Sequence, residues 1–201
     1  CFYGKTTLIT KCMNTLQMTE DQSSFTDRIP FKLPEGGLSG KLHFFDGKSV
    51  KVVSYRDLLE DVRKFQKELL TAGLEKGHCV GIRATNCYEW VVIDLALVSL
   101  GSTLICFPEE GIDDTDIEEL AKRFELSLLF VTNEYMKEQW KDKKWIYCIN
   151  ETETNPDLQV RSTDQMGELK KRIEGTDTFT LVFSSGTSGE LKCLLLSKLG
   201  V

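Results

Sequence analysis

The strongest constraint on the fold is the alternation of short apolar runs with helical patterns from residue 79 onward. Runs rich in Val, Ile, Leu and Phe are typical of buried strands, and the segments between them carry helical spacing or helix-start residues. Strands that alternate with helices at this spacing predict right-handed crossovers and a mostly parallel sheet with helices on its faces. The expected fold class is therefore layered α/β. The expected strands are residues 79–84, 102–107, 126–132, 145–150 and 178–183.

The helices expected between these strands differ in character. Residues 88–100 are apolar on nearly every face, which predicts a buried helix, and Asn86 supplies a start signal for it. The acidic residues 113–114 are expected to open a helix that continues to Phe124, because acidic side chains suit the positive end of a helix dipole. A short helix is also expected over residues 134–140.

A two-stranded hairpin is expected ahead of the α/β unit. Residues 42–45 and 50–53 are strand-like, and Asp46-Gly47 between them is a strong hairpin signal. Ser54, followed three residues later by Asp57, resembles a capping box and predicts the start of an amphipathic helix. The apolar residues of that helix, at helical spacing, are Leu58, Val62, Phe65 and Leu69.

Composition limits the class of protein. Of the 201 residues, 41% are hydrophobic and 28% are charged, which is ordinary for a soluble globular protein. The net charge of −6 argues against a general nucleic-acid-binding protein, so no nucleic-acid partner is expected. The sequence shows no signal peptide and no membrane span, and a cytoplasmic protein is expected.

Two parts are expected: a loop-rich lead-in over residues 1–40 and one α/β domain over residues 41–201.

Seven cysteines raise the question of disulfides or a metal site. Their spacing contains no C-x-x-C pair, their number is odd, and the two histidines lie far apart in the sequence. Four of the cysteines lie inside apolar, strand-like runs. Small buried side chains in a reducing compartment are therefore expected, and no metal site is expected.

A segment rich in hydroxyls and glycines follows the last expected strand. Residues 184–189 are Ser-Ser-Gly-Thr-Ser-Gly, Lys192 follows, and a second apolar run begins at Leu194. Glycines let the backbone approach a ligand closely, while N–H groups, hydroxyls and a lysine together suit a polyphosphate. Ligands of open α/β sheets bind beyond the carboxyl ends of the strands, where this loop is expected to lie. Similar turns also occur in loops that bind nothing, so composition alone leaves both interpretations open.

Other interpretations of the polar residues are not favoured. A Walker A loop places Lys directly after its second Gly and then opens a helix, whereas residues 190–191 intervene here and a strand-like run follows. The pattern is not the G-x-G-x-x-G of dinucleotide-binding folds. Ser185 as a hydrolase nucleophile would need G-x-S-x-G, which is absent at this position. Asp94 lies inside the apolar helix, where a functional role is one interpretation and a polar contact with a neighbouring loop is the favoured one.

The stretch from Phe183 to Lys192 resembles the phosphate-binding signature of the adenylate-forming superfamily. This superfamily contains acyl-CoA synthetases, fatty-acyl-AMP ligases, peptide-synthetase adenylation domains and luciferases. The resemblance covers roughly residues 42–201 and implies the N-terminal subdomain. Leu191 stands where the superfamily commonly has Pro, and Cys193 where it commonly has Gly. The upstream blocks similar in sequence and order are VSYRDL from Val53, GLEKGHCVGI from Gly73, NCYEW from Asn86, and residues 96–108.

The resemblance implies an ATP-dependent ligase that works in two steps. A carboxylate attacks the α-phosphorus of ATP, pyrophosphate leaves, and an acyl-adenylate remains. The thiol of CoA, or of the phosphopantetheine arm of an acyl-carrier or peptidyl-carrier protein, then takes the acyl group. The implied cofactors are ATP and Mg²⁺, and the implied substrate is a carboxylic acid, by default a fatty acid. The residues assigned to ATP phosphate binding are Ser184, Ser185, Gly186, Thr187, Ser188, Gly189 and Lys192.

The resemblance also implies that the chain carries only part of an active site. Superfamily members are considerably longer, and their adenine and acyl pockets, Mg²⁺-linked segment and catalytic lysine follow the stretch covered here. No catalytic residue is therefore assigned, and the chain alone is expected to be inactive. The alternative is a non-catalytic nucleotide-binding or interaction module derived from the same superfamily, which Leu191 and Cys193 favour slightly.

Overall fold

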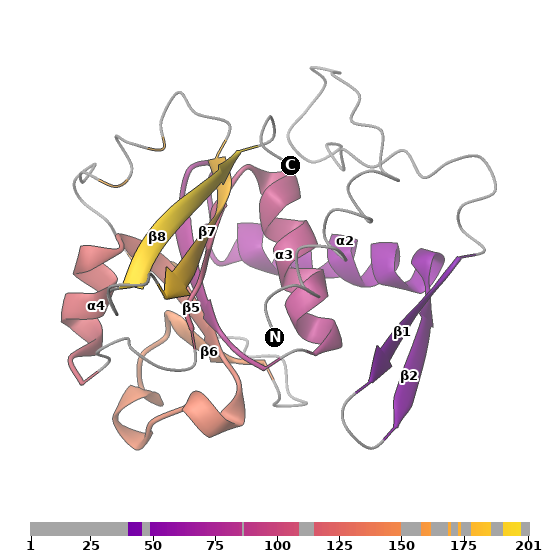
Figure 1. The fold of residues 1–201 in the computed structure, drawn as a ribbon, viewed down its shortest axis with the longest axis horizontal. Coiled ribbons are helices and arrows are strands. Elements are labelled where there is room, and N and C mark those ends of the chain that lie inside the picture. The colour runs from indigo at the N-terminus through magenta and orange to yellow at the C-terminus, as the bar shows by residue number, and fades with distance from the viewer. Residues whose placement is uncertain are drawn as a thin grey trace.

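The computed structural model describes residues 40–45, 49–85, 87–108, 115–149, 158–161, 169, 173, 178–185 and 191–197. These residues form a six-stranded sheet flanked by helices, with a separate two-stranded hairpin (Figure 1). The expected layered α/β class is confirmed. The sheet has the strand order β6-β5-β3-β4-β7-β8. Its strands are β3 (Cys79–Arg83), β4 (Thr103–Cys106), β5 (Leu126–Val131), β6 (Ile146–Cys148), β7 (Thr178–Ser185) and β8 (Leu191–Ser197).

The sheet is parallel except at one edge. Strand β3 pairs in parallel with β4 and β5, β4 with β7, and β5 with β6, whereas β8 pairs antiparallel with β7. The mostly parallel sheet was expected from the sequence. All six residues of β5 are buried, because a strand inside a parallel sheet is covered on both faces and carries a continuous apolar run.

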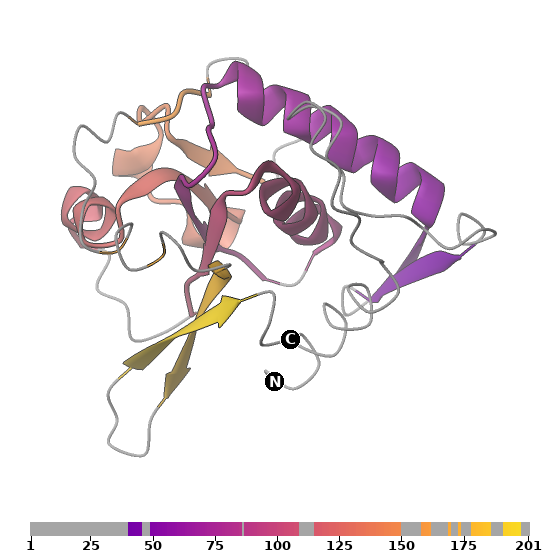
Figure 2. The same ribbon diagram turned by 90° about the horizontal axis from the view of Figure 1, so that it is seen from above.

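Helices cover both faces of the sheet. Figure 2 shows α2 (Tyr55–Thr71) and α3 (Tyr88–Leu100) on one side and α4 (Ile117–Arg123) on the other. Helix α3 packs against both α2 and β4, which explains why its sequence is apolar on nearly every face. Within the described residues, no helix is long and apolar enough to cross a membrane.

The N-terminus of α4 is capped by Asp116. Its side chain accepts hydrogen bonds from the backbone N–H groups of Glu118 and Glu119, at 3.0 and 3.1 Å, as an aspartate at the N-cap position does. The helix therefore begins at Ile117. The prediction that the acidic residues 113–114 open this helix is wrong, and those two residues lie outside the described part of the chain.

Two further local predictions need correction. The N-cap of α3 is Cys87, which makes no side-chain capping hydrogen bond, so Asn86 is not the N-cap and lies outside the described residues. The segment 134–140 was expected to be one helix. It forms two short 3₁₀ turns instead, η2 (Asn133–Tyr135) and η3 (Glu138–Trp140).

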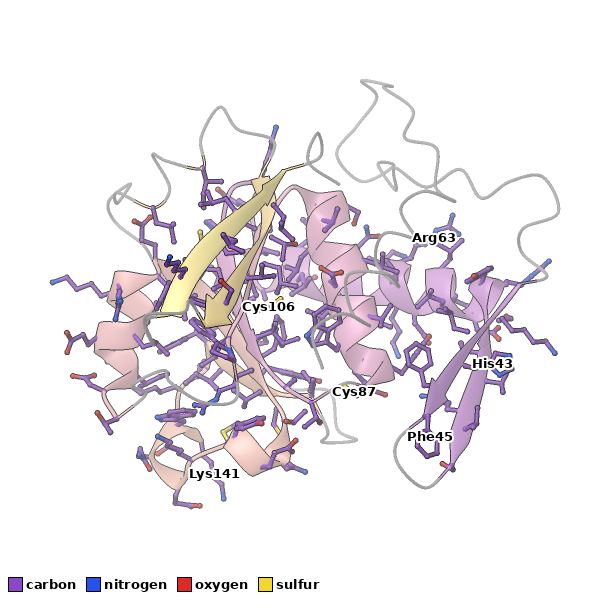
Figure 3. All side chains as sticks on the ribbon, viewed as in Figure 1. His43, Phe45, Arg63, Cys87, Cys106 and Lys141 are labelled. Carbon is purple, nitrogen blue, oxygen red and sulfur yellow. The ribbon has the colours of Figure 1, made fainter. Side chains whose placement is uncertain are left out.

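The expected hairpin is confirmed as β1 (Lys41–Phe45) paired antiparallel with β2 (Val50–Ser54). Leu42 and Val53 are buried on its inner face. His43 and Phe45, which alternate with the inner residues, are exposed on the outer face (Figure 3). The predicted turn Asp46-Gly47 lies outside the described residues.

Tyr88, the first residue of α3, fixes this hairpin to the helices. The ring of Phe44 meets the Tyr88 ring edge-on with 5.4 Å between centroids, and Lys51 Nζ lies 4.2 Å from the centroid of the same ring. The Tyr88 hydroxyl donates a hydrogen bond to Asp61 Oδ2 of α2 at 2.6 Å. Burial, and then this hydrogen bond, raise the pKa of Tyr88. One side chain thus connects the hairpin, α2 and α3.

Replacing Tyr88 with Phe removes the hydroxyl donor and keeps the ring contacts. We expect Tyr88→Phe to lower the free energy of unfolding of the 201-residue chain by about 1 kcal/mol, because a partly buried hydrogen bond to a carboxylate is lost. Urea unfolding followed by circular dichroism measures this change. Tyr55→Phe on the same helix pair is the matched control, since the Tyr55 hydroxyl donates no hydrogen bond to a described residue. An equal loss in both variants would contradict the role of the Tyr88 hydroxyl.

Candidate functional site

The phosphate-binding residues expected from the sequence lie at the end of the β7–β8 hairpin. Ser184 of β7 stands directly opposite Lys192 of β8. Strand β7 continues through Ser185, so the prediction that the strand ends at Phe183 is wrong by two residues. Residues 186–190 connect the two strands and lie outside the described residues. The expected site residues among them are Gly186, Thr187, Ser188 and Gly189.

Ser184 and Lys192 lie on the same face of the hairpin. Directly opposed residues of an antiparallel pair share a face, with their Cβ atoms about 4.5–5.5 Å apart. Ser184 is half-buried and Lys192 is exposed. A hydroxyl, which can donate a hydrogen bond, and an ammonium group with three donors are therefore presented side by side. This donor set suits an anion such as a phosphate group.

The hairpin end lies at the edge of the sheet where ligands of this fold class bind. Strands β3, β4 and β7 are parallel neighbours, so their carboxyl ends meet at one edge. The chain leaves β3 for α3 on one face and leaves β4 for α4 on the other face (Figure 2). Such a topological switch point is where open α/β sheets bind ligands. The switch point lies between β3 and β4, and Ser184 lies on β7, the next strand after β4.

The cysteines of the described residues take no part in a disulfide. No disulfide involves Cys79, Cys87, Cys106, Cys148 or Cys193. Of these, Cys79 and Cys148 are buried, as expected for small apolar side chains. Burial raises the pKa of Cys87 to about 11, which keeps this thiol protonated. Within the described part of the chain, no three His, Cys, Asp or Glu side chains gather in a way that could hold a metal ion.

Asp94 is buried inside α3. Its side chain is 5% exposed, and Oδ1 has no hydrogen-bond partner among the described residues. The expected polar contact with a neighbouring loop is therefore not formed by Oδ1 within this part of the chain. Burial disfavours the carboxylate and raises the pKa of Asp94 from 3.8 to about 7.

The Asp94 carboxyl makes the stability of the chain depend on pH. In the unfolded chain it titrates near 3.8, so between that value and about pH 7 only the folded state holds the proton. The stabilisation of the folded state by this proton is therefore complete below pH 3.8 and is lost as the pH rises through about 7. We expect Asp94→Asn to remove this dependence and to raise the free energy of unfolding at pH 8 by a few kcal/mol, at about 1.36 kcal/mol per pKa unit.

Chemical unfolding of the 201-residue chain between pH 4 and pH 8 tests this expectation. Glu60→Gln, which changes an exposed carboxyl on α2, is the control and should leave the pH profile unchanged. A profile that keeps its slope in Asp94→Asn would contradict the assignment.

Comparison with known proteins places the chain in a family. The family model for AMP-binding enzymes matches residues 39–200. The chain belongs to this family. Among curated proteins it is 24% identical over 173 residues to long chain acyl-CoA synthetase 2 of Arabidopsis thaliana, an alignment that covers 74% of the chain and 25% of that relative. The chain thus spans about a quarter of the length of this relative.

Solved structures share the fold at low sequence identity. A fatty acyl-adenylate ligase from L. pneumophila, in complex with acyl adenylate and pyrophosphate, matches with a TM-score of 0.57 and 13% identity, over 87% of this chain and 30% of that one. The o-succinylbenzoate coenzyme A synthetase of Bacillus subtilis, in complex with ATP and magnesium ion, matches with a TM-score of 0.52 and 16% identity, over 75% and 38%. The resemblance to the N-terminal subdomain of adenylate-forming enzymes is therefore confirmed at the level of the fold.

Proposed function

We propose that this chain is the N-terminal part of an ATP-dependent acyl-activating ligase and that the end of its β7–β8 hairpin binds the ATP polyphosphate. The observation that carries the proposal is the pairing of Ser184 with Lys192 at the carboxyl edge of a parallel sheet. Membership of the AMP-binding family supports it. The relatives solved with ATP and magnesium, and with acyl adenylate and pyrophosphate, support the choice of ligand.

In the proposed reaction, the carboxylate of an acid attacks the α-phosphorus of ATP. The bond from that phosphorus to the bridging oxygen breaks, and pyrophosphate leaves with the bonding electrons. The Ser184 hydroxyl and the Lys192 ammonium group would stabilise the negative charge that grows on the pyrophosphate. The thiol of CoA or of a carrier-bound phosphopantetheine would then displace AMP from the acyl-adenylate. This acceptor is proposed from the family.

The donor set at the hairpin fits phosphate better than it fits a metal ion. Hydroxyl and ammonium groups bind phosphate oxygens, whereas Mg²⁺ prefers carboxylate and carbonyl oxygens with nearly octahedral geometry. Mg²⁺, which the family implies, would neutralise phosphate charge. The described residues contain no cluster of carboxylates to hold it. We therefore assign none of its ligands to the described residues.

A fatty acid is the proposed acid substrate, because the curated relatives include the long chain acyl-CoA synthetases 2 and 3 of Arabidopsis thaliana. A nonribosomal peptide synthetase, sirP, is also among the relatives, which makes an amino acid and a carrier protein the alternative pair. The proposed location is the cytoplasm. The alternative function, a non-catalytic nucleotide-binding module, is favoured only by Leu191 and Cys193.

The Lys192 ammonium group provides the main test of the phosphate assignment. We expect Lys192→Ala to lower kcat/KM for ATP–pyrophosphate exchange by the full-length gene product about 10- to 150-fold, because a hydrogen bond to a charged group contributes about 1.5–3 kcal/mol. Lys192→Arg keeps the charge and should retain more activity. Lys41→Ala removes an exposed lysine of β1 and is the matched control. Unchanged exchange in Lys192→Ala would sink the assignment.

The 201-residue chain alone is expected to show no ATP–pyrophosphate exchange. It spans about a quarter of the length of an acyl-CoA synthetase relative, so groups that bind adenine and the acid would be missing. Exchange of labelled pyrophosphate, with fatty acids of several lengths and the full-length gene product as positive control, measures this. Robust turnover by the chain alone would overturn the expectation. A full-length gene product that binds ATP but activates no acid would favour the non-catalytic module.

A further inference from the structure

Three phenylalanines pack together behind the carboxyl end of β7. Phe107 follows β4, Phe124 ends α4, and Phe183 lies in β7 directly before Ser184. The rings of Phe107 and Phe183 are stacked, with 5.8 Å between centroids and 21° between planes. Phe124 meets both rings edge-on, at 5.1 and 5.7 Å. The three side chains are 6–8% exposed and form a closed aromatic triangle in which each ring contacts the other two.

The Phe107 ring is also seated against the backbone of β3. A Cβ atom at Gly81 would lie 2.7 Å from Phe107 Cε2 and 2.8 Å from Leu129 Cδ1. Any side chain at residue 81 would therefore displace the ring, and glycine leaves room for it. Cys106, labelled in Figure 3, pairs with Val182 of β7. The next residue, Phe107, therefore lies directly beside β7. The aromatic triangle thus joins β3, β4, α4 and β7.

The triangle and the polar pair lie on opposite faces of β7. Successive side chains of a strand point to opposite faces. Phe183 points towards α4, because it contacts Phe124, so Ser184 and the opposed Lys192 point to the other face. The four residues from Lys192 to Leu195 in β8 are exposed. At the end of the hairpin that carries Ser184 and Lys192, Phe183 is therefore the described side chain that is buried in the core.

We propose that the aromatic triangle positions Ser184 and Lys192 for polyphosphate binding, with Phe107 as the central positioning residue. This inference rests on the proposed function and adds a group that acts through the backbone of β7 without touching ATP. Groups held in place before binding lose less conformational freedom when the anion arrives. Loosening the triangle should therefore weaken ATP binding beyond what a general loss of stability explains.

Phe107→Leu in the full-length gene product tests the inference, since it removes the ring and keeps an apolar side chain. Phe65→Leu is the matched control. Phe65 of α2 forms a ring pair with Phe130 of β5 at 5.8 Å, and β5 is separated from β7 by β3 and β4. We expect both variants to lower the Tm. Only Phe107→Leu should raise the KM for ATP in pyrophosphate exchange, by about 10-fold, with kcat changed less than about 2-fold.

A double-mutant cycle tests whether the rings act as one unit. Phe107→Leu and Phe183→Leu should each raise the KM for ATP, and the double variant should resemble the stronger single variant, because either change opens the same triangle. Multiplicative effects on KM would contradict a shared role. Should Phe107→Leu fail to fold, Phe183→Leu can be compared with Phe183→Tyr, which keeps the ring and is expected to restore most of the affinity for ATP.

The outcomes separate this inference from the proposed function. If Lys192→Ala impairs exchange while Phe107→Leu gives the same KM as Phe65→Leu, the triangle is only part of the core and the positioning role is wrong. If Lys192→Ala has no effect, the proposed phosphate site fails first, and the positioning role fails with it. If Phe107→Leu raises the KM for ATP and Phe65→Leu does not, although the two variants have the same Tm, the result supports both the phosphate site and the positioning role.

Discussion

The parallel pairing of β4 with β7 is the contact on which the candidate site depends. It joins Leu104, Ile105 and Cys106 to the segment 180–182, which lies far along the chain. A two-stranded hairpin is marginally stable alone, so β7 and β8 need this pairing to hold a defined position. Leu104, Ile105 and Leu181 are fully buried around it. Burial of apolar side chains therefore places a polar pair at the edge of the sheet.

The sequence was sufficient for the fold class because most residues of the parallel strands are buried and α3 is buried along most of its length. Their apolar runs are continuous, and each run has the length of one element, so strands and helices could be told apart. Helix starts were less certain. Residues 113, 114 and 116 are all aspartates, and each is a good N-cap residue. Composition cannot distinguish them, since the choice depends on which side chain reaches the N–H groups of the first turn.

The candidate site was predictable in its residue types but not in its geometry. Serine has no strong preference for strand or loop, so the end of β7 could not be located from Ser184 and Ser185. Pairing with β8 extends the strand through both residues. Phe107 ends one of the expected strands, but its contact with Phe183 joins elements distant in sequence. Gly81 gave no signal either, because an isolated glycine in a strand has several explanations.

The element that follows the polar segment determines where positive charge must come from. Phosphate loops that lead into a helix gain from the positive end of the helix dipole. Here a strand follows, and sheets have only small net dipoles, so in the proposed site the ammonium group of Lys192 would supply the positive charge that a helix supplies in those loops. Its face depends on the hairpin register, since a slip of one residue would turn Lys192 to the opposite side. Phe183, buried against Phe107 and Phe124, fixes the face of β7 that carries Ser184, because turning β7 over would expose the Phe183 ring. The aromatic contacts that hold β7 therefore determine the face of Ser184, and the pairing of β7 with β8 places Lys192 on that same face.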